Sequence, residues 1–508
     1  MSTEDQNRAI ITFKKGVDTD QAVNELLDQG YELHNAKPDS VSNFDFVMTR
    51  EQAEALKSDE RVRDVRYGSK EENGIIPMHN IIEPSRNHQR DNTINNTHYP
   101  WAFAECTSTS TKYTSSQATY NYSHAYSLDG EGVDSVVQDS GIEADHPEWL
   151  ARDGVTSRLK QIDWPSASGF SGTYTQGSQH YTDQYGHGTH CASTMAGRLY
   201  GWANASDIYA IKIFDTDAFG VSASFNMIRG WHNNKTNNRP TVVNMSWGYF
   251  GTYTNITGGN YRGTPWTGTS QQTAYGMVFG GQDNSGNWTH PVRVTSVESD
   301  MEDCITDGVI LVGAAGNSEH KMDITTGTDY NNYFTNNFGN RYYHRGGTPQ
   351  AAADTICVGA IDYLYQTSTQ ERCAGFTEKG PRVDIFAPGT AVQAAIPQSA
   401  TLSTSTTTYP LNSSYRIRKL QGTSMACPNV AGIVATLMQL RPDYTPQQCM
   451  AWIKDQAINN RLYDPTAGTS ADYTNTRALQ GAPNNYLQTP FVSGEPQKFS
   501  GGIQFSSS

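Results

Sequence analysis

Three short motifs contain the residue types that together can activate a serine as a nucleophile. Asp139 ends an apolar run, His187 lies between two glycines, and Ser424 lies in a Gly-Thr-Ser motif. A serine hydroxyl becomes reactive when a histidine takes its proton and an aspartate orients that histidine. The three residues occur in the order Asp, His, Ser, each at an expected strand end, turn or helix start. We predict that they form a catalytic triad. Alone, Ser424 would be read as a helix N-cap; the other motifs favour the nucleophile.

A fourth motif supplies a donor for a developing negative charge. Asn317 ends a run of very small residues, 313–316. Its side-chain amide can donate to an oxyanion, as can the backbone N–H of Ser424 at the positive end of a helix. The alternative for Asn317 is an ordinary turn asparagine. The small residues before it favour the oxyanion role, because they let a substrate backbone approach closely.

Uncharged segments on either side of these motifs could line a peptide-binding cleft. An extended peptide can pair with such backbone as an added strand. The predicted substrate-contacting residues are Gly220, Ser246, Trp247, Gly248, Ala314, Ala315 and Gly316. A pocket without a counter-ion disfavours charged side chains, so these walls predict a preference for apolar or aromatic residues.

Three nearby residues have competing interpretations. His190 lies one helical turn after His187, and His146 lies in a loop after Asp139; we expect both to be packing residues. Cys191 is either a reactive thiol beside the active site or a small buried hydrophobe. The sequence leaves these two readings of Cys191 equally open.

The elements that must position these residues alternate between strands and helices. Strands are expected at 133–137, 208–214, 241–245, 309–313, 355–360 and 383–386. Helices are expected after His187, at 222–232, after Ser424, and from Pro446, which Thr445 caps. This alternation predicts an α/β fold in which helices flank both faces of a parallel sheet.

The chain divides into several expected units. Residues 1–70 predict a small α+β lobe with strands at 9–13, 31–34, 44–48 and 62–67 and helices from Thr19 or Asp20 and at 51–57. The other units are a linker with a processing site at 71–105, a main domain at 106–460 and a C-terminal extension at 461–508. Surface insertions are expected at 249–297 and 323–347.

Composition restricts the function further. The net charge of −14 argues against nucleic-acid binding, and no apolar run approaches the ~18 residues of a membrane helix. Seven scattered cysteines favour reduced thiols. The N-terminus lacks the pattern of a secretory signal, which predicts a cytoplasmic or virion-associated protein.

These motifs resemble those of the subtilisin-like serine peptidases, and most of all the proteinase K branch. The resemblance runs from about Gly130 to Ile458. It rests on the motifs at 139–143 with 146–148, 187–192, 243–248, 314–317, 384–390 and 422–426 with Pro428. It implies endopeptidase activity on protein or peptide substrates, with the triad and oxyanion residue named above. It also implies that residues 9–67 are an inhibitory pro-domain.

The resemblance carries one cofactor expectation and shows two departures. Asp384 resembles a calcium ligand of relatives, with backbone carbonyls near Ala353 and Thr355, so the one cofactor that the resemblance suggests is a structural calcium ion. Asn429 stands where the family usually has histidine, and Cys427 is unusual beside Ser424. We expect little effect from Asn429, because that position is not catalytic.

An alternative from another class is a structural protein, such as a virion component that keeps this fold as a scaffold. The Asn-, Thr- and Tyr-rich insertions and the missing signal motivate it. An intact triad favours the peptidase.

Overall fold

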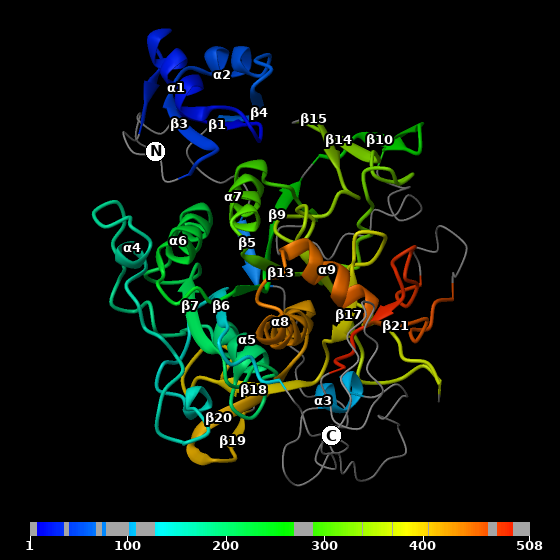
Figure 1. Cartoon of the computed structure of the whole chain (residues 1–508). Helices are drawn as coiled ribbons and strands as arrows, with labels where there is room; N and C mark the ends of the chain where they lie inside the picture. Colours follow the sequence, from blue (N-terminus) through cyan, green and yellow to red (C-terminus); the bar gives the residue numbers. More distant parts are fainter. Residues whose placement is uncertain are drawn as a thin grey trace.

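The computed structural model has an α/β architecture built on one large sheet (Figure 1). It describes residues 8–34, 40–67, 74–77, 101–107, 128–253, 255–268, 288–337, 339–367, 369–404, 406–465 and 475–490. Most of the expected linker and much of the C-terminal tail therefore lie outside the described residues.

The central sheet has eight strands in the order β21-β22-β17-β16-β13-β8-β6-β7. All neighbouring pairs from β22 to β7 are parallel, and β21 alone is antiparallel. The strands are β6 (Asp134–Asp139), β7 (Asp207–Lys212), β8 (Thr241–Met245), β13 (Ile310–Ala314), β16 (Ile356–Ile361), β17 (Ile385–Pro388), β21 (Ile458–Asn459) and β22 (Asn485–Tyr486). The predicted parallel sheet is confirmed, with strand ends shifted by one or two residues.

Helices cover both faces of this sheet. One core contains Val137 and Val242 with residues of α5 (His187–Ala196) and α8 (Thr423–Leu440). The other contains Val136 and Val243 with residues of α6 (Val221–Asn234) and α7 (Thr295–Thr306). Successive strand residues thus point to opposite, equally apolar layers, as expected for a sheet buried on both sides.

The N-terminal lobe is a separate four-stranded sheet in the order β2-β3-β1-β4 with two helices. Its elements are β1 (Arg8–Phe13), α1 (Thr19–Asp28), β2 (Glu32–Leu33), β3 (Asn43–Val47), α2 (Arg50–Leu56) and β4 (Val62–Tyr67). The predicted α+β lobe is confirmed and has its own apolar core. Asp18, and not Thr19 or Asp20, caps α1, because its side chain accepts from the N–H of Gln21.

The lobe packs against α7 through polar contacts (Figure 1). Ser40 donates to the Asp300 carboxylate at 2.6 Å, and the Asn43 amide donates to the same carboxylate at 2.9 Å. At the edge of the interface, Arg63 forms an ion pair with Glu302 at 2.7 Å. The sequence did not predict α7, whose buried Asp300 is paired by this distant lobe.

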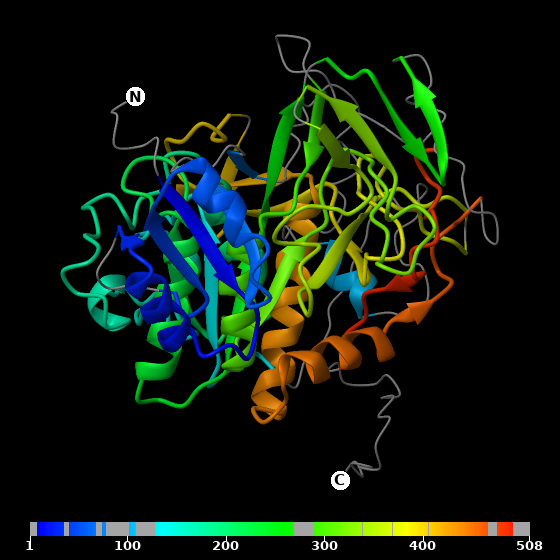
Figure 2. The same cartoon turned by 90° about the horizontal axis from the view of Figure 1, so that it is seen from above.

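The two expected insertions together form a second sheet, β11-β10-β14-β15, at one side of the molecule (Figure 2). It comprises β10 (Gly258–Tyr261), β11 (Thr264–Thr267), β14 (Tyr333–Asn336) and β15 (Gly339–Tyr342). A third sheet joins β5 (Gly74–Pro77), β9 (Trp247–Tyr253) and β12 (Trp288–Pro291). The first insertion is not entirely surface, since Tyr249 is fully buried.

Two boundaries differ from the sequence prediction. The helix α3 (Trp101–Cys106), assigned to the linker, is buried, and its Trp101 indole donates to the carbonyl of Thr390 at 3.0 Å. The tail is not wholly an extension, because β22 joins the central sheet.

The remaining elements are short or peripheral. They are the 3-10 turn at Pro147–Trp149, α4 (Trp164–Ala167), α9 (Pro446–Asp455) and the sheet of β18 (Val392–Ile396), β19 (Thr407–Tyr409) and β20 (Asn412–Leu420). Thr445 caps α9, as predicted. None of the described helices combines the length and apolar character needed to cross a membrane.

Candidate active site

Asp139 and His187 meet at the carboxyl end of the central sheet. Asp139 is the last residue of β6, and His187 is the first residue of α5. The Asp139 Oδ1 atom lies 2.7 Å from His187 Nδ1, and both side chains are fully buried. A hydrogen bond of this kind fixes Nδ1–H as donor and turns Nε2 toward the reacting group.

Asp183, which the sequence analysis missed, fixes the start of α5. Its carboxylate accepts from the N–H of Gly186 at 2.7 Å and from the N–H and hydroxyl of Thr189 at 2.8 and 2.6 Å. It also accepts from Ser140 at 2.8 Å, whose hydroxyl accepts from the N–H of Gly188. Asp183 therefore ties the helix of His187 to the segment after Asp139. Its position four residues before His187 was the only signal in the sequence.

Ser424 lies in the first turn of α8, after Gly422 in an extended conformation that only glycine adopts easily (φ 149°). Its hydroxyl donates to the carbonyl of Ser246 at 2.9 Å. The Ser246 hydroxyl donates back to the Ser424 carbonyl at 3.0 Å. The nucleophile candidate is thus held at the helix N-terminus and against the end of β8.

Asn317 is oriented by the residue before Ser424. Its Oδ1 atom accepts from the N–H and the hydroxyl of Thr423, each at 2.9 Å. Its Nδ2 atom is buried and has no hydrogen-bond partner among the described residues. Since Oδ1 is used for orientation, the amide N–H groups remain available to a ligand oxygen, which fits the predicted oxyanion role.

The residues predicted to line the cleft differ in what they offer to a ligand. Ser246 directly precedes β9 and Gly248 is its second residue. The Trp247 side chain between them is fully buried and donates to Gln138 at 3.1 Å. Trp247 therefore offers backbone, not side chain, to a ligand. Ala314 and Ala315 are buried, and a side chain at Gly316 would collide with Glu378.

Gly220 is the N-cap of α6, with nothing within 4 Å of where a side chain would start. The described contacts do not connect it to the triad, so its role in substrate binding stays a prediction.

A strand of the chain itself lies along the wall that contains Gly248. In the antiparallel pairing of β5 with β9, Ile76 lies opposite Gly248 and Pro77 opposite Trp247. Trp247 directly follows Ser246, whose carbonyl accepts from the nucleophile candidate. Residues 74–77 therefore already pair as an added strand that runs toward Ser424.

The two rival histidines are structural, as predicted. The Nε2 atom of His190 lies 3.1 Å from the carbonyls of both Val392 and Arg418, and burial lowers the pKa of His190 to about 3. His146 Nδ1 accepts from the N–H of Glu148 at 3.1 Å, and burial lowers its pKa to about 4.

Cys191 lies between His187 and Ser424, in a buried position that does not favour a reactive thiol. Its sulfur lies 3.8 Å from His187 Nδ1 and 3.5 Å from the carbonyl of Ser424. Burial, followed by the nearby Asp139 charge, raises the pKa of the Cys191 thiol well above its usual value. The structure therefore favours the buried-hydrophobe reading. The Cys191 sulfur, Asp139 and His187 are close enough together to bind one metal ion. However, Asp139 and His187 are already hydrogen-bonded to each other.

The two departures from the family pattern are also structural. Asn429 accepts from the Trp202 indole at 2.8 Å and donates to the Met425 carbonyl at 2.9 Å. Cys427 is fully buried, with its sulfur 3.3 Å from the carbonyl of Val312.

The surroundings of Asp384 do not fit the expected calcium ion. Arg382 donates to Asp384 Oδ2 at 2.7 Å, and Lys454 donates to Oδ1 at 2.8 Å. Calcium requires six to eight oxygen ligands and no competing cation. We therefore place no calcium ion at Asp384.

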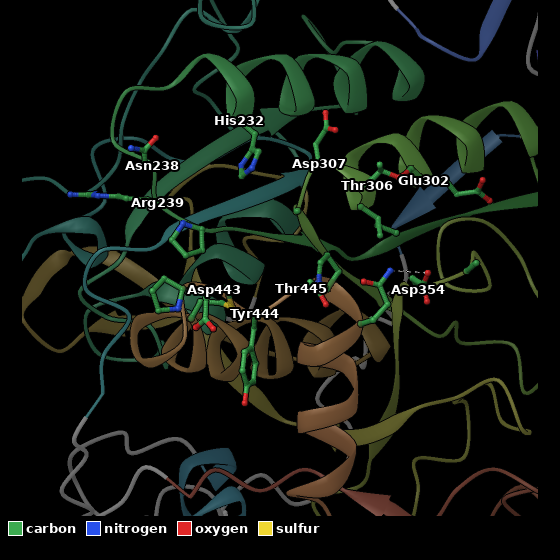
Figure 3. A pocket seen from close by; sticks show the side chains of 18 of the residues that line it. His232, Asn238, Arg239, Glu302, Thr306, Asp307, Asp354, Asp443, Tyr444 and Thr445 are labelled. Atoms are coloured by element: carbon green, nitrogen blue, oxygen red, sulfur yellow. Dashed lines mark hydrogen bonds between the residues drawn. The ribbon is translucent and has the colours of Figure 1, made fainter. Parts of the chain in front are cut away.

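A separate pocket of about 730 Å³ has none of these residues in its lining (Figure 3). Its wall carries groups of both charges, including Lys15, Arg239, Glu302 and Asp443. It shares no residue with the triad, so we do not assign the chemistry to it.

Comparison with known proteins identifies a family match and several relatives of this chain. The model of the subtilase family, peptidase S8, matches residues 130–486. Subtilisin-like protease 2 of Pseudogymnoascus destructans is 29% identical over 69% of this chain and 63% of its own length. Proteinase R of Parengyodontium album is 26% identical over 73% of this chain and 68% of its own length.

A solved structure resembles the fold. Fervidolysin from Fervidobacterium pennivorans, a keratinolytic enzyme related to subtilisin, superposes with a TM-score of 0.53 at 18% identity. The superposition covers 94% of this chain and 60% of that one. The chain spans less than two thirds of the length of the first relatives it matches.

Proposed function

Because this chain belongs to the subtilase family, we propose that it is a serine endopeptidase with Ser424 as nucleophile, His187 as general base and Asp139 as the residue that orients the base. The observation that carries the proposal is the hydrogen-bonded Asp139–His187 pair. An inert scaffold would require neither this pair nor a serine in the first turn of the neighbouring helix α8.

In the first half of the reaction, the Ser424 hydroxyl attacks the scissile carbonyl carbon while His187 Nε2 takes the hydroxyl proton. Asp139 stabilises the imidazolium that forms. The carbonyl oxygen becomes negative, and the N–H of Ser424 and the amide of Asn317 donate to it. His187 then passes its proton to the departing amine, which leaves an acyl-enzyme.

In the second half, His187 takes a proton from water, and the hydroxide attacks the ester carbon. The same donors stabilise the second oxyanion. When the carbon–oxygen bond to Ser424 breaks, His187 returns the proton to the serine hydroxyl, so that the enzyme is restored.

Substrates of this enzyme would be extended peptides with a broad apolar or aromatic preference. The pairing of β5 with β9 supports the extended conformation, because four residues of the chain already form such a strand. The small, uncharged wall of Ala314, Ala315 and Gly316 supports the side-chain preference. A cleavage profile dominated by arginine or lysine would contradict it.

The enzyme would be made as an autoinhibited zymogen, with residues 1–70 as pro-domain and a cut in 71–105. The lobe contacts on α7 and the β5 strand on β9 support this view, because the cleft wall is covered by the chain itself. Processed enzyme titrated with residues 1–77 should lose activity as the fragment is added. A folded fragment that does not inhibit would contradict the zymogen proposal.

The triad assignment is tested with a fluorophosphonate probe. We expect labelling of Ser424 in processed protein and loss of labelling and hydrolysis in Ser424→Ala, with the fold retained. Ser166→Ala changes an exposed serine at another helix and should leave both unchanged. Full hydrolysis by Ser424→Ala would refute the assignment.

A further inference from the structure

Four oxygen atoms near Asp384 are of the kind that bind cations. The Asp384 carboxylate supplies two of them, and the backbone carbonyls of Ala352 and Thr355 supply the others. Acidic and carbonyl oxygens of this kind are the ligands that hard divalent cations use. The family resemblance led us to expect calcium at this place.

The guanidinium of Arg382 lies among these oxygens. Its Nη2 atom donates to the carbonyls of Ala352 and Thr355, each at 2.7 Å. Its Nη1 atom donates to Asp384 Oδ2 at 2.7 Å. One planar cation therefore joins the same backbone and carboxylate oxygens that an ion would join.

The negative charge of Asp384 is already more than balanced by neighbouring cationic side chains. Lys454 from α9 donates to the other carboxylate oxygen at 2.8 Å, so one carboxylate meets two cationic side chains. Burial is the largest influence and opposes the Arg382 charge, but the charges of Asp384 and Cys357 and the hydrogen bond to Asp384 together outweigh it and raise the pKa of Arg382. A divalent cation here would meet two like charges, with the oxygens already accepting hydrogen bonds.

We propose that the Arg382 guanidinium takes the structural place of a divalent cation, so that this chain needs no calcium at Asp384. The guanidinium joins the turn before β16 to the segment before β17. The strand β16 pairs with β13, which leads to Asn317. The contact thus supports, from a distance, the wall that carries the oxyanion donor.

The test uses full-length Ser424→Ala protein, so that self-digestion does not interfere and the result is independent of activity. Its melting temperature is measured with a chelator and with millimolar calcium, the range in which weak oxygen sites bind. Asp384→Asn in the same background identifies any calcium effect that arises elsewhere. We expect no calcium effect that depends on Asp384.

Removing the guanidinium should open the site to an ion. We expect Arg382→Ser to melt roughly 3 °C lower or more in chelator. Calcium should restore at least half of this loss of melting temperature in Arg382→Ser. It should restore a larger share in Arg382→Ser/Lys454→Met, because that double variant lacks both competing cations. Arg441→Ser is the matched control, because Arg441 pairs with Asp443 at the surface. It should neither gain a calcium effect nor melt as low.

Three results would overturn the proposal. The first is a calcium effect in the parent protein that Asp384→Asn removes. The second is an Arg382→Ser protein that melts like its parent. The third is a loss of stability that calcium fails to restore in both Arg382→Ser and the double variant.

Discussion

Asp139 and Asp384 are buried carboxylates of the same sheet, yet their partners differ in kind. Asp139 ends β6 and pairs with His187, whose charge can change. Asp384 precedes β17 and pairs with two cationic side chains, the Arg382 guanidinium and the Lys454 ammonium. Each also accepts one backbone N–H, from Ser140 and from Cys357.

This difference in partners implies two different roles. Asp139 can assist proton transfer, whereas Asp384 can hold two backbone segments in place. A histidine partner can gain a positive charge during a reaction, and its aspartate then stabilises that charge. A guanidinium stays protonated at every working pH and provides fixed, planar geometry. We therefore expect changes at Asp139 to act on turnover and changes at Asp384 to act on stability.

The strongest test of this comparison is Asp139→Asn. The amide cannot hold His187 in the required tautomer, so we expect kcat to fall by about 10⁴-fold with little change in melting temperature. Asp384→Asn should give the reverse, with kcat near the parent value and a lower melting temperature. The comparison fails if the two variants lose the same property.

The next largest effect is expected for Asn317→Ala. Losing one oxyanion donor costs about 10²- to 10³-fold in kcat. Because the Asn317 amide donates mainly to the charged intermediate, KM should change little. Steady-state kinetics on a peptide substrate separates the two constants, and a loss confined to KM would make Asn317 a binding residue.

The catalytic role of Asp139 and its partners could be predicted from the sequence. Asp139, His187 and Ser424 each belong to a local motif whose glycines and flanking apolar run indicate a strand end or a helix start. Asp183 was missed because its role depends on donors from two segments. No local pattern distinguishes it from a loop aspartate.

The structural contacts of Asp384 could not be predicted from the sequence. Arg382 lies two residues before Asp384, but its other partners are carbonyls near residue 355 and depend on how two strands align. The helix α7 was missed for a related reason. Its buried Asp300 suggests an exposed segment until Ser40 and Asn43, about 260 residues away, are seen to pair with it.

A smaller effect is expected at the processing bond. The β5 register ends at Pro77 opposite Trp247, and Ser246 follows in the direction of Ser424. Met78 is the next residue in the sequence and lies outside the described residues. We expect the Met78–His79 bond to be cut, so that mature protein begins at His79.

Met78→Asp should slow this cut by about tenfold or more, because an ionised side chain is costly to bury in an uncharged pocket. Met78→Leu is the control and should be processed at the parent rate. Mass spectrometry over time follows both. Unchanged cleavage of Met78→Asp at the same bond would contradict the assignment.

The smallest effect concerns Glu148, a third buried carboxylate that receives hydrogen bonds from neutral donors. Its Oε1 accepts from Ser193 at 3.1 Å, from the N–H of Leu199 at 3.1 Å and from that of Tyr200 at 2.9 Å. The Tyr409 hydroxyl is a further neutral group that stabilises this carboxylate. Burial outweighs these donors and raises the pKa of Glu148 to about 7.

A raised carboxyl pKa makes the folded protein bind more protons than the unfolded chain between about pH 4.5 and 7. Stability should therefore fall as the pH rises through this window, by at most roughly 3 kcal/mol. Glu148→Gln keeps an oxygen acceptor and removes the proton. In the Ser424→Ala background, urea unfolding on either side of the window should show a flatter pH dependence for Glu148→Gln. An unchanged slope would mean that Glu148 stays ionised and that neutral donors alone can hold a buried carboxylate here.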